Sequence, residues 1–308
     1  MASSSLNEFE SGPSLAAVYD TDENASPRVY QLLGRGKFSV VHSTRRIADG
    51  LPVALKTIQI FEMGKREREE CMNEIRLLQA MDHPHIIHYL DCKLERNELT
   101  VVMELAEHGD LAKLIRGAAK AGAPLGEAAA WRHFAQIADA LAYMHERRVM
   151  HRDVKPANVF IADGPGGPGG GAARVMKLGD LGLGRYFSSQ TEITHSTVGT
   201  PYYMSPECIQ GGGYDFKSDI WSLGCILYEL ATLRSPFYKE GLNFYMLGKR
   251  IMARQFEPLG EVSESLYALV DSMLQVDPSK RPTAAEVHLL ASEAGAAYAD
   301  GGGGAAEA

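Results

Sequence analysis

The sequence predicts an α+β fold in which a small, β-rich lobe is followed by a larger, mostly helical lobe. Two observations lead to this prediction. Between Val29 and Leu105 the chain has short runs rich in β-branched residues, with one stretch of helical spacing among them. From Asp110 onward, apolar residues recur mainly at helical spacing. With 308 residues, the chain is long enough to bury a sizeable core.

The first lobe is expected to be a sheet accompanied by one helix. Residues 64–81 have helical spacing, because Cys71, Ile75 and Leu78 fall on one face. The dipeptide at residues 83–84, His-Pro, would end this helix. The expected strands lie near residues 29–34, 39–46, 51–61, 86–92 and 99–105.

The second lobe is expected to be built around two buried helices. Residues 220–232 are apolar on most sides, which indicates a helix inside a large domain, and this segment is too short to span a bilayer. Residues 127–147 form a second helix, whose apolar stripe consists of Trp131, Phe134, Ala138 and Leu141.

Two short strands, at residues 159–162 and 174–179, flank a segment rich in Gly and Pro at residues 163–173. Gly and Pro sustain neither a strand ladder nor a helix, so this segment is expected to be a loop. It would lengthen a surface hairpin and take no part in chemistry.

Acidic residues are concentrated at the two ends of the chain. Residues 1–27 are Ser-rich and contain acidic residues but no Lys or Arg, so a disordered acidic tail is expected. Residues 291–308 are expected to be a low-complexity tail after a brief continuation of the last helix. These ends account for the whole net charge of −8. The neutral middle has no polybasic footprint for nucleic acid or a membrane.

The four Cys residues are far apart and lack the spacing of a metal site, which favours a reduced, intracellular setting. Residues 1–27 also lack the apolar run of a signal peptide. We therefore expect a soluble, cytoplasmic protein.

Two blocks carry groups suited to phosphoryl transfer: HRDVKPAN at residues 151–158 and DLG at residues 180–182. Such a reaction needs positioned groups and bound metal ions. Asp153 can accept a hydroxyl proton, and Lys155 can neutralise the transferring group. Asn158 and Asp180 can hold a divalent metal ion. Either block alone fits a solvated loop or a turn, but their order and spacing argue against that interpretation.

A Gly-rich turn stands between the first two expected strands. At Gly34 and Gly36 the backbone N–H groups can approach phosphates closely. A GxG turn alone also fits a plain hairpin. The spacing through Val41 follows the pattern GxGxxGxV of phosphate-covering loops, with Ser39 in place of the third glycine.

Lys56 ends the run Val-Ala-Leu-Lys in the next strand. A lone lysine is usually a solvated surface residue, but apolar neighbours indicate a partly buried strand, in which a cation needs a partner. Glu74 lies on the apolar face of the following helix and is available. This ion pair would orient Lys56 toward nucleotide phosphates.

Three further motifs follow: GTPYYMSPE at residues 199–207, SDIWSLG at 218–224 and VDPSKRP at 276–282. With them, the chain resembles the serine/threonine branch of the eukaryotic protein kinases over residues 28–290. The segments DLGLGR, HSTVGTPYYMSPE and FKSDIWSLGC resemble NIMA-related (Nek) kinases, most of all the short members that consist of little more than a catalytic domain. The resemblance implies a bilobal protein kinase fold. Its N-lobe, with one regulatory helix, would span about residues 28–105, and its C-lobe about residues 106–290.

The resemblance implies ATP and Mg²⁺ as cofactors. Asp153 would be the catalytic base, Lys155 the γ-phosphate ligand, and Asn158 and Asp180 the magnesium ligands, while Lys56 and Glu74 would form the ion pair. The nucleotide would contact Leu33, Gly34, Arg35, Gly36, Lys37, Phe38, Ser39, Val40, Val41, Ala54, Lys56, Glu104, Ala106 and Phe160.

Within that set, the resemblance assigns particular roles. The backbone of Glu104 and Ala106 would bind adenine, with Met103 as the gatekeeper. The adenine ring would lie between Val41, Ala54 and Phe160. Outside the nucleotide site, Glu207 and Arg281 would form a buried structural ion pair. Leu181 replaces the Phe of the usual DFG motif.

The resemblance also leads to a regulatory hypothesis. Ser196 lies where the family carries an activating phosphoserine, with Thr197 as a competing site. A phosphate on Ser196 would offer acceptor oxygens to Arg152 and Arg185, and could order the loop.

The favoured interpretation is an active protein serine/threonine kinase of Nek type that acts on protein substrates. An upstream activating kinase is an expected partner. A role in the cell cycle or on microtubules would place the protein in the cytoplasm, with the nucleus or microtubule-organising centres as further sites. The alternative is a pseudokinase-like scaffold that binds protein partners without catalysis. A small-molecule kinase is disfavoured by the segment at residues 199–207, which looks like a peptide platform.

Overall fold

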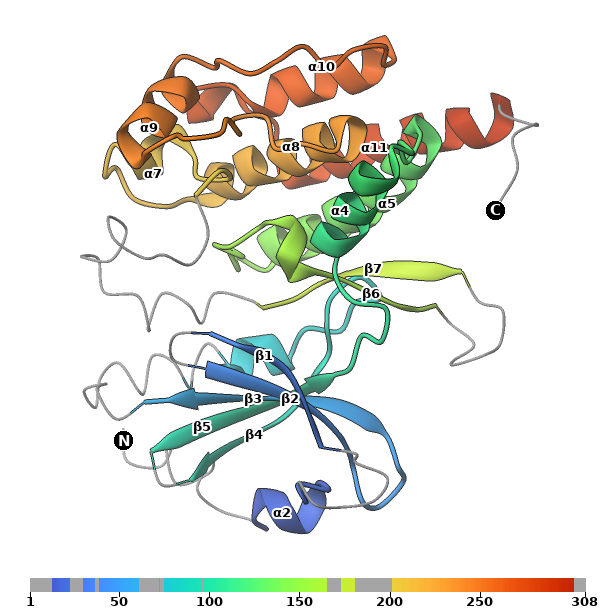
Figure 1. The fold of residues 1–308 in the computed structure, drawn as a ribbon, viewed down its shortest axis with the longest axis vertical. Coiled ribbons are helices and arrows are strands. Elements are labelled where there is room, and N and C mark those ends of the chain that lie inside the picture. Colours follow the sequence, from blue (N-terminus) through green and yellow to red (C-terminus); the bar gives the residue numbers. More distant parts are fainter. Residues whose placement is uncertain are drawn as a thin grey trace. The chain divides into compact units, whose positions relative to one another are not determined.

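The computed structural model describes residues 13–22, 30–36, 39–60, 72, 75–95, 97–164, 173–180 and 201–301 (Figure 1). The described chain divides between Glu107 and His108 into two compact units. The small unit holds the sheet of the first lobe, and the large unit holds most of the helices.

The small unit contains a five-stranded antiparallel sheet with the strand order β1-β2-β3-β5-β4 (Figure 1). Each strand lies where the β-branched runs predicted one, with ends shifted by a few residues. The strands are β1 (Gln31–Arg35), β2 (Ser39–Arg45), β3 (Pro52–Gln59), β4 (Tyr89–Glu95) and β5 (Glu98–Glu104).

The core of the small unit lies on both faces of β3. Successive side chains of a strand point to opposite faces. Val53 and Leu55 therefore share one face, while Ala54, Lys56 and Ile58 share the other. Val53, Leu55 and Ile58 are almost completely buried.

The helix expected over residues 64–81 is described only in part. Residues 75–79 are helical, and both Ile75 and Leu78 are buried, as their spacing predicts. Cys71 and Glu74 lie outside the described residues.

Residues 13–22 depart from the disordered tail expected for residues 1–27. They include the short helix α2 (Leu15–Val18), and the next residue, Tyr19, is only 3% exposed. The prediction relied on the acidic and Ser-rich composition and overlooked a short apolar run, which packs against a face of the sheet. The other residues of the predicted tail, 1–12 and 23–27, lie outside the described segments.

The large unit is mainly helical, with one two-stranded hairpin (Figure 1). Its helices are α4 (Leu111–Ala121), α5 (Glu127–Glu146), α7 (Pro206–Ile209), α8 (Phe216–Thr232), α9 (Phe244–Met252), α10 (Glu264–Met273) and α11 (Ala284–Gly301). The hairpin consists of β6 (Val159–Asp163) and β7 (Arg174–Leu178), and short 3₁₀ turns occur at Pro156–Asn158 and Pro278–Lys280.

Two helices form the centre of the large unit, as predicted. The stripe of α5, from Trp131 to Leu141, is buried, and so are residues 218–228 and Leu230 of α8. A capping box starts α8, because Asp215 accepts from the backbone of Ser218 while the Ser218 hydroxyl accepts from the backbone N–H of Asp215. No helix in the described parts of the chain has the length and apolar character needed to cross a membrane.

The last helix is longer than the low-complexity composition suggested. A capping box opens α11, since Thr283 and Glu286 each bind the other's backbone N–H group. Ala291 is fully buried, and an added Cβ on Gly295 would lie 4.0 Å from Cβ of Trp131 in α5. Small residues at these positions therefore let α11 approach α5 closely, and the helix continues to Gly301, where a tail was expected from residue 291.

Candidate functional site

The loop at residues 151–158 is held by a buried carboxylate. Asp219 in α8 is completely buried and accepts from the backbone N–H groups of His151 and Arg152, each at 2.9 Å. Its carboxylate also accepts from His145 Nε2 at 2.8 Å and from the hydroxyl of Tyr214. Burial would raise the pKa of Asp219, but these interactions hold it below its usual value.

Within this loop, one carboxylate oxygen is fixed and the other is open. Oδ2 of Asp153 accepts from Lys155 Nζ at 2.7 Å and from Asn158 Nδ2 at 2.8 Å. Asn158 Nδ2 also donates to the Asp153 carbonyl at 2.8 Å. Oδ1 of Asp153 makes no hydrogen bond to the described residues, and the side chain is 48% exposed. The three polar residues chosen from spacing therefore do meet.

The hairpin brings the second block to the first. Asn158 immediately precedes β6, and Asp180 follows β7 by two residues. Gly179 N donates to the Asn158 carbonyl at 2.9 Å, while His151 Nε2 donates to the Gly179 carbonyl at 3.1 Å. Because the strands are antiparallel, these two ends lie side by side, as the order of the motifs predicted.

The donor set at this point fits Mg²⁺. Mg²⁺ prefers oxygen ligands and commonly binds one or two protein groups, with waters and phosphates completing its shell. Asp180 supplies a carboxylate, and Asn158 keeps its amide oxygen available because its Nδ2 faces Asp153. In the described chain, no group of three or more His, Cys, Asp or Glu side chains is arranged to hold a metal ion on its own.

The Gly-rich turn connects β1 and β2 in the small unit. Gly34 pairs with Val41 and Arg35 with Val40, and Gly36 N donates to the Ser39 carbonyl at 2.7 Å. An added Cβ on Gly34 would meet no atom of a described residue within 4 Å, so packing among these residues does not explain the glycine there. Lys37 and Phe38 lie outside the described residues.

Three other residues of the predicted nucleotide set line one face of the sheet: Val41, Ala54 and Lys56. In β3, Ala54 pairs with Met103 and Lys56 pairs with Val41 of β2. Ala54 and Met103 are buried, whereas Lys56 is partly exposed. Glu74 is not among the described residues, so its ion pair with Lys56 stays a prediction.

The residues predicted to form an adenine-binding hinge lie at the end of β5 and just after it. Glu104 closes the strand, and its backbone N–H donates to the His88 carbonyl at 2.9 Å. Ala106, two residues on, makes no backbone hydrogen bond to the described part of the chain. Its N–H and carbonyl are therefore available to a ligand. Leu33 in β1 is 53% exposed, and in the large unit Phe160 is a partly buried residue of β6.

Comparison with known proteins agrees with this arrangement. Residues 28–290 match the family model described as protein kinase domain. The chain belongs to the protein kinase family.

The chain is also similar to individual Nek kinases. It is 38% identical over 257 residues to the probable serine/threonine-protein kinase nek3 of Dictyostelium discoideum, covering 83% of this chain and 22% of that protein. It is 36% identical to nek2 of the same organism, with 83% and 60% covered, and 35% identical to human Nek5, with 83% and 34% covered. The chain thus spans less than two thirds of the length of these relatives. The expected likeness to the short members stays a prediction.

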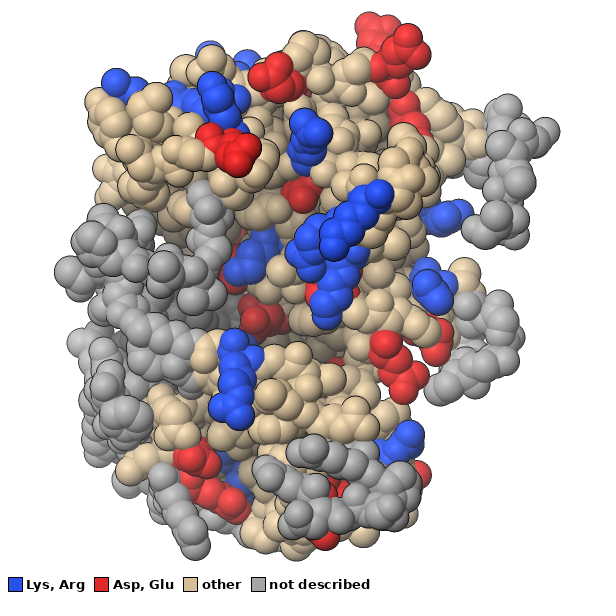
Figure 2. Space-filling view, viewed as in Figure 1, with Lys and Arg blue, Asp and Glu red and all other residues tan. Residues whose placement is uncertain are grey.

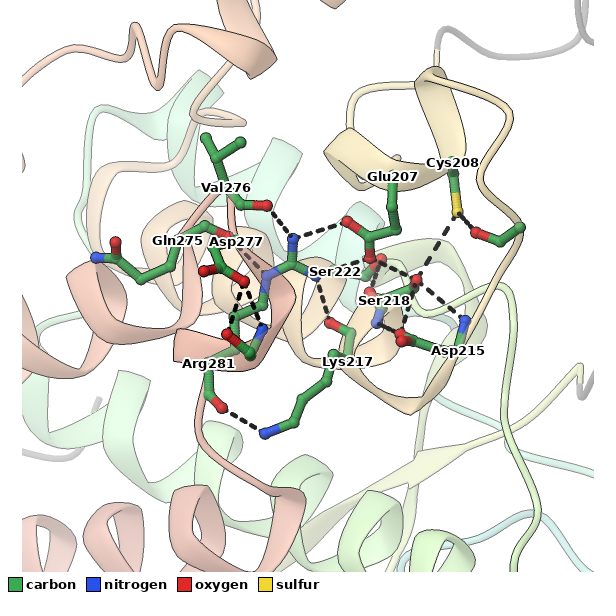
Figure 3. A network of polar contacts seen from close by, with 12 residues as sticks. Glu207, Cys208, Asp215, Lys217, Ser218, Ser222, Gln275, Val276, Asp277 and Arg281 are labelled. Atoms are coloured by element: carbon green, nitrogen blue, oxygen red, sulfur yellow. Dashed lines mark hydrogen bonds and ion pairs between the residues drawn. The ribbon is translucent and has the colours of Figure 1, made fainter.

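A buried ion pair organises the large unit of this protein kinase, as the resemblance implied. Arg281, 2% exposed, donates from Nη1 and Nη2 to the two oxygens of Glu207, both at 2.8 Å (Figure 3). Ser218 in α8 donates to Glu207 Oε1 at 2.6 Å. Burial would raise the pKa of Glu207, but Arg281 and Ser218 hold it at about 2. The guanidinium also donates to the carbonyls of Gln275, Lys217 and Val276.

The segment before α7 is fastened to α8 by two hydrogen bonds. Tyr203 donates from its hydroxyl to Glu229 Oε2 at 2.6 Å, and Ser222 Oγ donates to the Tyr203 carbonyl at 2.8 Å. Burial raises the pKa of Glu229, while the hydroxyl of Tyr203 and the charge of Arg116 oppose that rise. The basic residues of α4, which are Lys113, Arg116 and Lys120, are all exposed. Figure 2 shows basic side chains gathered on this face of the protein. This carboxylate–tyrosine contact was not predicted from the sequence.

Of the predicted regulatory residues, only Arg152 is described. Its backbone has a positive φ of 69° and is held by Asp219. Its guanidinium makes no hydrogen bond or ion pair with any described residue. Ser196, Thr197 and Arg185 lie outside the described residues, as does Leu181.

Sequence reasoning missed the residue that anchors the loop. Asp219 stands within the motif SDIWSLG, yet no role was assigned to it. An aspartate inside a helix apolar on most sides needs buried donors, and that was the available signal. Its partners were hidden, because His151 lies 68 residues away in the sequence.

We expect the free energy of unfolding to fall as the pH drops from 6.5 toward 4. Burial, with the charge of Arg132, lowers the pKa of His133 in α5 from 6.5 to about 4, and burial also lowers the pKa of His151. The unfolded chain therefore takes up these protons first, so stability is present above pH 6.5 and is lost as the pH falls. His133 would contribute at most about 3 kcal/mol.

Urea unfolding across this pH range, for the natural chain and for His133→Leu, checks this expectation. The leucine variant should lose less stability on acidification, because it has no proton to bind at this position. An identical pH dependence in the two proteins would contradict the assignment to His133.

Proposed function

We propose that this protein is an ATP- and Mg²⁺-dependent protein serine/threonine kinase. The observation that carries the proposal is the arrangement of Asp153, Lys155 and Asn158 around one carboxylate oxygen, with the metal-suited Asp180 beside Asn158. Membership of the protein kinase family and the similarity to Nek kinases support it.

Each residue of the large-unit site has a defined task in this proposal. Asp153 Oδ1 accepts the proton of the substrate hydroxyl, while Oδ2 is kept in place by Lys155 and Asn158. Lys155 also neutralises charge on the transferring phosphoryl group. When bound, Mg²⁺ and ATP supply that group and offset its negative charge. Asn158 and Asp180 provide oxygen ligands for the ion.

The small-unit residues bind the nucleotide. The backbone of Gly34 and Gly36 approaches the phosphates, and Lys56 pairs with them, oriented by Glu74. Ala106 offers its backbone N–H and carbonyl to the adenine edge. Val41 and Ala54 supply apolar contact with the ring. Of the other residues in the set named from the sequence, Leu33 and Arg35 lie in β1, Ser39 and Val40 in β2, and Glu104 in β5.

The substrates in this proposal are proteins with Ser or Thr acceptors. The segment at residues 201–205 is fixed to α8 through Tyr203 and Ser222, which suits a rigid platform for an extended peptide. A small-molecule substrate would not need such a platform. A scaffold without catalysis is the competing function. It is disfavoured because Lys155 and Asn158 both bind Oδ2 of Asp153, an arrangement that suits the proposed reaction.

The cellular role is proposed from the Nek resemblance alone. We infer a role in cell-cycle or microtubule regulation, with the protein in the cytoplasm and also in the nucleus or at microtubule-organising centres. We expect neither nucleic acid nor a membrane among its partners. An upstream kinase is the proposed activator.

We expect Asp153→Asn to lower phosphoryl transfer to a generic protein substrate by about 10²–10⁴-fold, because the general base is lost. ATP binding should remain, since most nucleotide contacts are elsewhere. Labelling of the substrate with γ-phosphate-labelled ATP measures phosphoryl transfer, and a nucleotide titration measures ATP binding. Asp163→Asn is the matched control: the same change at the far end of β6, where Asp163 pairs with His108. Equal labelling by Asp153→Asn and the natural chain would overturn the assigned base.

We further propose that phosphorylation of Ser196 activates the enzyme through Arg152 and Arg185. The guanidinium of Arg152, which has no partner among the described residues, supports this proposal, because a buried or ordered cation favours an anionic partner. Ser196→Ala should lower activity about tenfold or more, which corresponds to one charge-assisted hydrogen bond.

A double-mutant comparison sharpens this test. In an Arg152→Gln background, Ser196→Ala should have little further effect, because the two residues act as a pair. Thr197→Ala should leave activity unchanged, and phosphosite mapping should find phosphate on Ser196. Full activity of Ser196→Ala would refute the proposal.

A further inference from the structure

Residues 13–22 lie before the part of the chain that matches the kinase family, and the proposed function gives them no task. They are nevertheless built into the small unit. Tyr19 forms a core cluster with Val53, Leu55 and Val102. Four partly buried apolar residues pack around this cluster: Leu15, Val18, Tyr30 and Leu90.

Backbone hydrogen bonds fix the segment along the end of β2. Asp20 N donates to the Arg45 carbonyl at 3.0 Å, and Ile47 N donates to the Val18 carbonyl at 2.9 Å. Tyr19 and Arg46 thus form an antiparallel bridge. The Thr44 hydroxyl, in β2, donates to the Asp20 carbonyl. The segment therefore has a definite register on the sheet rather than a loose apolar contact.

The contacts of Tyr19 lie directly behind residues proposed to bind the nucleotide. Val53 and Leu55 alternate with Ala54 and Lys56 along β3, so the two pairs point to opposite faces. Leu55 pairs with Val102, which precedes Met103 at the start of the hinge. The ring of Tyr19 therefore packs against β3 and β5 on one face of the sheet. Ala54 and Lys56 lie on the opposite face.

We propose that residues 13–22 are a brace that positions the nucleotide-binding strands, with Tyr19 as its positioning residue. This proposal rests on the proposed function for its effect on ATP, but not for its effect on the sheet. The brace acts by packing: the aromatic body is buried, while the Tyr19 hydroxyl makes no hydrogen bond to any described residue. A well-packed neighbour on one face restricts the movement of a strand and so of the side chains on its other face.

The ring and the hydroxyl of Tyr19 can be separated by substitution. Tyr19→Ala removes the packing, whereas Tyr19→Phe keeps the ring and loses only the hydroxyl. A chain lacking residues 2–12 is the second control, because this deletion ends before the brace and leaves residues 13–22 in place. Tyr19→Leu, which keeps an apolar side chain, replaces the alanine variant if that variant does not fold.

Two measurements on the full chain test the brace. In ligand-free protein, Tyr19→Ala should speed amide hydrogen exchange in residues 53–58 and 101–104 while leaving β6 and β7 unchanged. In a titration with Mg²⁺ and a fluorescent ATP analogue, its dissociation constant should rise about tenfold. Both controls should stay within about twofold of the natural chain, a difference of about 0.4 kcal/mol.

The outcomes separate the brace from the proposed function. If the natural chain binds no nucleotide, the proposed function fails, and the exchange measurement alone decides the brace. Natural exchange rates in β3 and β5 of the alanine variant would overturn the brace. Uniformly faster amide exchange across both units would also overturn the brace, because that pattern indicates general destabilisation. A third contradicting result would be a Tyr19→Phe variant that binds the ATP analogue as weakly as Tyr19→Ala.

Discussion

The rest of the large unit depends on one buried carboxylate, Asp219. A charge removed from water is costly unless hydrogen bonds satisfy it. Asp219 meets this requirement with the backbone N–H groups of His151 and Arg152, together with His145 and Tyr214. Satisfying this carboxylate fixes the backbone of the loop, including the positive φ of Arg152. The side chain of Asp153, one residue on, is thereby directed toward Lys155 and Asn158.

The same helix also supports the proposed peptide platform. Ser218, next to Asp219 in α8, binds Glu207, which Arg281 pairs on both oxygens. Farther along α8, Ser222 and Glu229 hold Tyr203. A helix buried on nearly all sides is a suitable base for both parts, because it cannot shift without repacking the unit. The loop at residues 151–158 and the proposed platform are therefore held by one rigid element, whereas the small-unit residues proposed to bind nucleotide depend on strand packing.

Local patterns made much of this arrangement predictable from the sequence. The strands and the helices α5 and α8 follow from periodicity, and the contact of Asp153 with Lys155 and Asn158 follows from spacing within one short loop. Long-range dependence was not predictable. Three of the four partners of Asp219, namely His145, His151 and Arg152, lie 67–74 residues away in the sequence, and nothing local marks them. Composition was misleading at Tyr19 and along α11. In a segment of biased composition, a few apolar or small residues suffice to pack it against the protein when a complementary face of the sheet or of a helix is available.

The most direct test of this account is the steady-state kinetics of Asp219→Asn with a protein substrate. The amide replaces one acceptor oxygen with a donor, so it cannot accept both backbone N–H groups as the carboxylate does. A displaced loop would move Asp153, and a misplacement of about 1 Å can cost about a hundredfold in rate. We predict a fall in kcat of that size, with the KM for ATP within about twofold of the natural value. An unchanged kcat in the folded variant would contradict the account.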